Sequence, residues 1–173
     1  MQVKIGPGGT SGLGYENGIP EIAERGLSAL EVEFTYGVRM SNDKAREIRE
    51  IARKNNISLT VHAPYYVNLA SPERHKVRAS AERIIQSCEK AEHLGADYVV
   101  FHPGFYQKKP PEEVFELVKG EIIEIQERIK ENNKWEKMIK LAEKEGQVMD
   151  GSVYAEERET KSSFLDKFKG LFQ

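Results

Sequence analysis

The sequence predicts an α/β fold, a partial (half) (β/α) barrel of four βα units followed by a divergent C-terminal hairpin and helix segment. Three observations support this prediction. Short apolar runs alternate with longer amphipathic helices, two of these runs end in a histidine, and the alternation stops after residue 133. Strands that alternate with helices of this length are typical of a parallel sheet with right-handed crossovers.

Each unit has its own local signals. Strands are expected at residues 3–5, 29–34, 57–63 and 97–103, and helices at residues 19–26, 41–56, 71–95 and 110–133. Ser41 or Asn42 is the expected N-cap of the second helix, because both side chains accept hydrogen bonds from a first helical turn. Ser71 is the expected cap of the third helix, with Pro72 at its first position and Gly95 as its stop.

The last forty residues follow a different pattern. We therefore predict two domains, residues 1–133 and residues 134–173. The second domain is expected to hold a further helix over "KWEKMIKLAEKEG", a hairpin at Asp150-Gly151 and a Phe-rich amphipathic helix over residues 162–173. The Phe-rich helix is expected to dock on apolar surface or to mediate self-association rather than to bind a membrane, because it carries too few lysines for firm surface binding.

Strand periodicity places three polar side chains on one face of the sheet. Because side chains alternate along a strand, Glu33 lies opposite Leu30, Val32 and Phe34, and His62 lies opposite Val61. His102 follows the same parity in its own segment, "DYVVFHP". Both histidines end their strands, which is where parallel sheets and barrels carry their chemistry.

These residue types favour a metal site at that edge, since neutral imidazole is a common ligand for zinc and similar ions. We therefore predict His62, His102 and Glu33 as metal ligands. Two simpler interpretations stay open. A histidine at a strand end is often only a hydrogen-bonded polar residue, and Glu33 could pair with a basic group such as Lys4.

Composition and charge argue against several kinds of protein. A net charge of −2 gives the whole chain no general attraction to nucleic acid, so DNA binding would need a local patch. One cysteine, Cys88, excludes a disulfide framework within the chain and favours a cytoplasmic location. No run of 18 apolar residues is present, so no membrane span is expected.

Two linked motifs carry a family resemblance. The stretch "LTVHAPYYVNLASPERHKVRASAERIIQSCEKAEHLGADYVVFHPGFY" resembles endonuclease IV, the zinc-dependent apurinic/apyrimidinic endonuclease, in its archaeal-like form. That family belongs to the xylose isomerase-like TIM barrels, and the resemblance covers about residues 1–133. It implies a zinc site with His62 and His102 as ligands. It also implies DNA contacts by Tyr65 and by Arg39, which lies in the loop after the second expected strand.

The resemblance implies metal-dependent hydrolysis of the phosphodiester 5′ to an abasic site, with abasic DNA as the partner. Family members carry further Asp, His and Glu ligands on later strands, whereas this chain has no histidine after His102. We therefore expect the chain to be weak or inactive alone. The alternatives are a non-enzymatic half barrel and a sugar-isomerase-like TIM barrel protein. A homodimer that closes the half barrel is the expected assembly, because a lone half barrel leaves strand edges unpaired.

Overall fold

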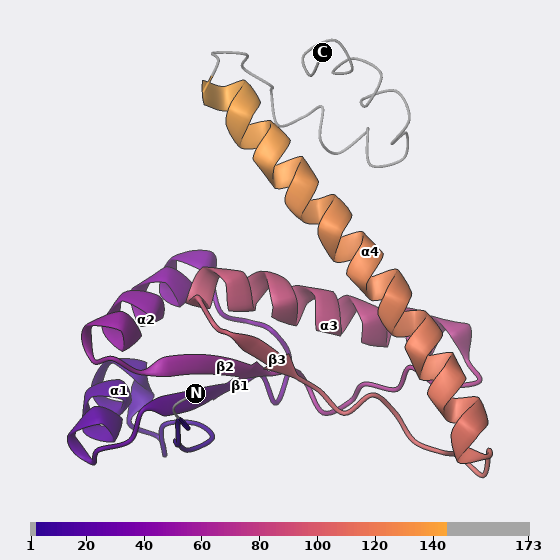
Figure 1. Cartoon of the computed structure of the whole chain (residues 1–173), viewed down its shortest axis with the longest axis horizontal. Helices are drawn as coiled ribbons and strands as arrows, with labels where there is room; N and C mark the ends of the chain where they lie inside the picture. The colour runs from indigo at the N-terminus through magenta and orange to yellow at the C-terminus, as the bar shows by residue number, and fades with distance from the viewer. Residues whose placement is uncertain (1–2, 145–173) are drawn as a thin grey trace. The chain divides into compact units, whose positions relative to one another are not determined.

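A computed structural model describes residues 3–144 and contains a three-stranded parallel sheet with helices between its strands (Figure 1). The strands lie in the order β1-β2-β3, with β1 at Ala29–Glu33, β2 at Ser58–His62 and β3 at Tyr98–Val100. The helices are α1 (Gly14–Glu24), α2 (Asn42–Lys54), α3 (Arg74–Leu94) and α4 (Pro111–Lys144). This arrangement confirms the predicted partial α/β barrel.

The first expected strand is reduced to an extended edge segment. Glu31 N donates to the carbonyl of Pro7 at 3.0 Å, and Gly9 N donates to the carbonyl of Glu31 at 2.9 Å, but only Gly8 forms a bridge with β1. Pro7 has no N–H to donate, which shortens any ladder here. The segment also lies very close to β1, because a Cβ added to Gly6 would stand 1.6 Å from the carbonyl oxygen of Ala29.

The main core lies between one face of the sheet and helices α1, α2 and α3. Leu30 and Val32 of β1 and Val61 of β2 are at most 1% exposed, whereas Glu33 is exposed, as strand parity predicts. The helices contribute the other core side chains, including Ile19, Ile48 and Leu94. Because the apolar face of the sheet packs on these helices, Glu33 and His62 lie on the opposite face.

Of the residues predicted to cap or stop helices, Ser41 and Gly95 match the structure. Ser41 caps α2, because its Oγ accepts a hydrogen bond of 3.1 Å from Lys44 N. Gly95 ends α3 with φ 64° in the left-handed region, which glycine adopts without steric cost. Ser71 as the cap of α3 was wrong. The helix begins at Arg74, Glu73 holds the cap position, and Ser71 Oγ accepts from Glu73 N within the preceding turn.

Helices α1 and α4 also differ from expectation. α1 begins at Gly14 rather than residue 19 and contains Pro20. Proline has no backbone N–H to donate within the helix, and the burial of Ile19 and Ile22 stabilises the helix despite this loss. α4 continues to Lys144 without the expected break after Asn133, since neither proline nor glycine interrupts that stretch.

A second core cluster joins α4 to α3. Ile125 of α4 is 4% exposed and belongs to the same cluster as Ile84 and Ile85 of α3. The chain divides into two units after Ile129, and the sheet and both core clusters belong to the first. The predicted boundary at residue 133 stays a prediction, and the hairpin and Phe-rich helix predicted after it lie outside the described residues. Within residues 3–144, no helix has the length and apolar character that crossing a membrane requires.

Candidate metal centre

His62 ends β2 at the same rung of the sheet as Glu33 on β1 and Val100 on β3. Its side chain is buried, with 7% of the residue exposed. Ring atom Nδ1 lies 2.7 Å from the carbonyl oxygen of Ala63. A carbonyl only accepts hydrogen bonds, so Nδ1 is the donor of this bond, and in the neutral imidazole Nε2 is then the nitrogen with the lone pair. This is the arrangement that orients a histidine ligand toward a metal ion.

His102 lies two residues beyond the end of β3, and its ring centroid is 5.2 Å from that of His62, at an interplanar angle of 49°. The predicted convergence of the two rings is therefore confirmed, although His102 is outside the strand that was expected to carry it. Two imidazoles that share one tetrahedral ion through bonds of about 2.0–2.1 Å have centroids roughly 5 Å apart. The observed separation fits a shared ion.

Tyr65 completes a cluster of three rings. Its centroid lies 4.8 Å from that of His62 and 5.5 Å from that of His102, and its ring stacks on His102 at 22°. We call His62, Tyr65 and His102 the ring cluster. Tyr65 contacts both histidine rings and still keeps 47% of its surface exposed. Its predicted DNA contact stays a prediction.

Glu33 occupies a different environment from the ring cluster. A Cβ added to Gly8 or Gly9 would meet the Glu33 carboxylate at 3.2 or 3.3 Å, so this carboxylate lies against the glycine-rich edge segment. Burial raises the pKa of the Tyr15 phenol, and the nearby negative charge of Glu33 raises it further. Among residues 3–144, no three His, Cys, Asp or Glu side chains gather in a position to hold a metal ion. The ring cluster thus offers two imidazole ligands, half of a tetrahedral set, and Glu33 as a ligand stays a prediction.

Arg39 lies on the segment between β1 and α2, and its side chain is exposed. The structure therefore leaves its guanidinium accessible, as a DNA contact requires, but tests no further part of that prediction.

Exposed aromatic side chains follow every strand of the sheet, a feature that our sequence reading did not use. Tyr36 follows β1 and is 79% exposed, Tyr66 follows β2 at 49%, and Phe105 and Tyr106 follow β3 at 61% each. The signal was available in "TYG", "PYY" and "GFY", where aromatic residues lie within six positions of each strand end. Flat rings with an exposed face can stack on bases or sugars.

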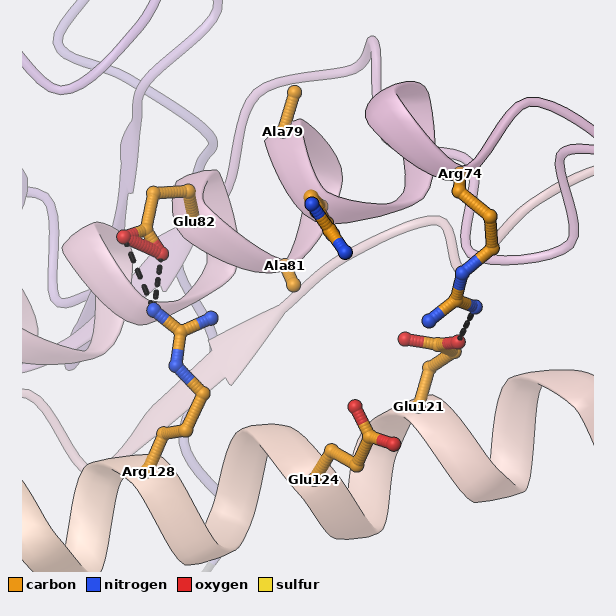
Figure 2. Close-up of a pocket in the computed structure, with 8 residues that line it drawn as sticks. Arg74, Ala79, Ala81, Glu82, Glu121, Glu124 and Arg128 are labelled. Atoms are coloured by element: carbon orange, nitrogen blue, oxygen red, sulfur yellow. Dashed lines mark hydrogen bonds and ion pairs between the residues drawn. The ribbon is translucent and has the colours of Figure 1, made fainter.

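A groove between α3 and α4 holds a set of charged side chains (Figure 2). Arg74 pairs with Glu121 at 2.6 Å, and Arg128 pairs with Glu82 at 2.5 Å, so each pair joins the two helices. Arg78 and Glu124 also line the groove, and its three positive and three negative side chains balance. No member of the ring cluster lines it. We interpret the groove as a helix-to-helix contact, because both ion pairs join α3 to α4. The exposed pair of Arg128 with Glu82 contributes about 0–1 kcal/mol.

Comparison with known proteins identifies related chains. The family model described as xylose isomerase-like TIM barrel matches residues 19–149. An uncharacterised protein of Methanocaldococcus jannaschii is 36% identical over 107 residues, which cover 62% of this chain and 38% of that protein. A protein of Aster yellows witches'-broom phytoplasma named "Probable endonuclease 4" is 36% identical over 112 residues, which cover 60% of this chain and 38% of that protein. This chain thus spans less than half the length of these relatives.

A solved structure supports the same fold at lower identity. D-psicose 3-epimerase from Clostridium cellulolyticum aligns with a TM-score of 0.57 and 19% identity, over 68% of this chain and 43% of that chain. At this identity the likeness concerns the fold alone. It shows that the sheet and helices described above match part of a complete barrel.

Proposed function

Because this chain belongs to the xylose isomerase-like TIM barrel family, we propose that its ring cluster is the remnant of an endonuclease IV-like centre. The proposed reaction is metal-dependent hydrolysis of the phosphodiester 5′ to an abasic site in DNA. The relatives named "Probable endonuclease 4" support this choice of chemistry. The observation that carries the proposal is the convergence of His62 and His102, with Nε2 of His62 free of its backbone hydrogen bond.

The protein groups have separate roles in this proposal. His62 and His102 hold a divalent ion, most simply zinc, which when bound supplies a Lewis acid and a water of lowered pKa. Glu33 is a candidate third ligand only if its carboxylate turns away from the edge segment. Tyr65 stacks against a nucleotide with its exposed face, and Arg39 contacts the DNA backbone. A cytoplasmic location belongs to the same proposal, since a DNA repair protein with one cysteine suits a reducing compartment.

The first test is incision of an abasic duplex. We expect the 173-residue chain to nick this substrate slowly compared with a full-length relative, because two imidazoles hold an ion loosely and leave its water poorly oriented. The measurement is a denaturing-gel assay with an end-labelled abasic duplex, with and without EDTA. The nicking should disappear with EDTA and in H62A and H102A.

The control is H75A, which removes an exposed histidine outside the ring cluster. Nicking that survives EDTA and both ring-cluster substitutions would contradict the proposal. If no variant and no condition gives nicking above background, the non-enzymatic half barrel becomes the better description. That alternative is favoured by the lack of a three-ligand group within residues 3–144.

We also propose that a second copy of this chain closes the half barrel. The support comes from the sheet, where β3 is an edge strand and Tyr98 and Val100 on its open face are 68% and 43% exposed. A complete barrel has eight parallel strands, whereas the described part of this chain contributes three strands and one bridged edge segment. A second copy would therefore supply most of the strands that are missing. An exposed parallel edge with apolar side chains favours pairing with another chain.

The second test is the mass of the chain in solution. We expect the wild type to be a dimer by light scattering during gel filtration, and Y98K/V100K to be a monomer, because lysines on the open face would be buried without partners. Y36K is the control, since Tyr36 is exposed in a segment outside the sheet. A monomeric wild type at the highest soluble concentration would contradict the proposed dimer.

A further inference from the structure

The separation of His62 and His102 cannot be set by the sheet alone. His62 belongs to β2 and is held by its ladder, but β3 ends at Val100, two residues before His102. Contacts outside the sheet must therefore hold His102. The next two residues, Pro103 and Gly104, make such contacts with the loop after β2.

The loop after β2 provides that support. Leu69 N donates a hydrogen bond of 2.8 Å to the carbonyl oxygen of Pro103, the residue next to His102. The loop itself is firmly placed, because Val67, Leu69 and Ala70 are each at most 2% exposed. The two loops that carry the ring cluster are thus joined directly by their backbones.

Asn68 makes the closest approach between these loops. A Cβ added to Gly104 would lie 2.7 Å from Asn68 Oδ1, whereas the next nearest atoms, the backbone nitrogens of Leu69 and Ala70, would lie at 3.4 Å. The first distance is far inside van der Waals contact and the second is ordinary. Asn68 is therefore the one side chain that a larger residue at position 104 would strike.

Asn68 is itself held on both sides. Its Oδ1 accepts a hydrogen bond of 3.1 Å from Ala70 N, and its backbone N donates to Ser80 Oγ at 2.9 Å. Ser80 is 2% exposed and donates to the carbonyl of Lys76 one turn earlier in α3. A side chain added at position 104 must either break the hydrogen bond between Asn68 and Ala70 or move the His102 loop.

We propose that Asn68 and Gly104 are positioning residues, which set the spacing of His62 and His102 through the contact between their loops, with Ser80 anchoring Asn68 to α3. The role as a metal centre rests on the function proposed above. The spacing itself does not, since it is a property of the chain's own loops. Outer residues that orient metal ligands typically change affinity 10–100-fold when they are replaced.

The experiment combines G104A, N68A and the double variant N68A/G104A. Two readouts are taken on the full 173-residue chain: Co²⁺ affinity from its visible absorption, and the nuclear Overhauser effect between the His62 and His102 rings without metal. We expect G104A to bind Co²⁺ at least tenfold more weakly and to lose the ring-to-ring signal. N68A/G104A should recover both in part relative to G104A, because the clashing atom is gone while the backbone strain of an alanine at φ 157° remains. Such recovery would not follow from general destabilisation.

G120A controls for the added methyl group, since a Cβ at Gly120 in α4 would meet nothing within 4 Å. G26A controls for backbone strain, since Gly26 has φ 76° and a Cβ there would also meet nothing within 4 Å. Both should leave the two readouts unchanged, and circular dichroism should show that all variants fold. If G104A keeps the wild-type ring-to-ring signal, or if N68A/G104A is no better than G104A, the positioning role is wrong. If the wild type binds no Co²⁺ but the ring-to-ring signal follows the expected pattern, the positioning role stands and the proposed metal function fails.

Discussion

Replacing His102 with alanine is expected to weaken Co²⁺ or Zn²⁺ binding by more than about 100-fold while the protein stays folded. In the proposed centre the ring cluster supplies two imidazoles, so one substitution removes half of the proposed protein ligands. Loss of a direct ligand should cost more than the 10–100-fold typical of residues that only orient ligands. His102 is the better choice for this test because it is exposed, whereas His62 is buried and its removal would also leave a cavity.

Calorimetric titration with Zn²⁺ and spectroscopic titration with Co²⁺ give the affinities. H75A is the comparison, because the His75 side chain is 76% exposed on α3 and lies outside the ring cluster. Equal affinities of H102A and wild type would rule out the ring cluster as the metal centre. A matching loss in H75A would indicate general surface binding instead.

Replacing Leu30 with alanine is expected to lower the free energy of unfolding by about 2–5 kcal/mol. Leu30 lies in β1, is 1% exposed and belongs to the core between the sheet and helices α1, α2 and α3. Its removal loses apolar burial and leaves a cavity that the surrounding strands cannot fill. Since small domains are stable by only about 5–15 kcal/mol, L30A should unfold at a clearly lower urea concentration.

Urea titration followed by circular dichroism measures this change. I123A in α4 is the control, because Ile123 is 51% exposed and its truncation removes little buried surface. The midpoint of I123A should lie close to that of wild type. An L30A midpoint equally close would mean that the main core does not support the sheet as described.

The parts of the fold that sequence reasoning predicted are those set by periodicity and by strong local signals. The alternation of Leu30, Val32 and Glu33 gave the correct buried face of β1, because side-chain direction along a strand has a strict period of two. Gly95 was a reliable stop, since its left-handed conformation is costly for other residues. The same alternation predicted that His62 and His102 converge.

The errors concern features that depend on neighbours in space. Ser71 has the right side chain for a cap, but its hydroxyl accepts from Glu73 within the turn that precedes α3. Residues 3–5 have strand-like composition, yet Pro7 and the following glycines leave the segment with one bridge to β1. Glu33 lies at the same rung as His62, as the parity predicted, and its role as a metal ligand stays a prediction because strand parity does not say which way a long carboxylate side chain turns. The approach of Asn68 to Gly104 joins two loops whose residues are 36 positions apart, and no local pattern reports it.

The contact between Gly6 and Ala29 limits which sequences can share this sheet edge. The carbonyl of Ile5 accepts hydrogen bonds from Ser28 N and Ala29 N, and the carbonyl of Pro7 accepts one from Glu31 N. The backbone on both sides of Gly6 therefore cannot move away from β1 without breaking them. A related chain with any side chain at this position must therefore detach the segment from β1 and expose another strand edge. In an alignment of relatives, the residue at the position of Gly6 would therefore distinguish two groups. Chains with glycine there can cover the edge of β1 with their own N-terminal segment, and chains with any other residue leave that edge open to a neighbouring chain.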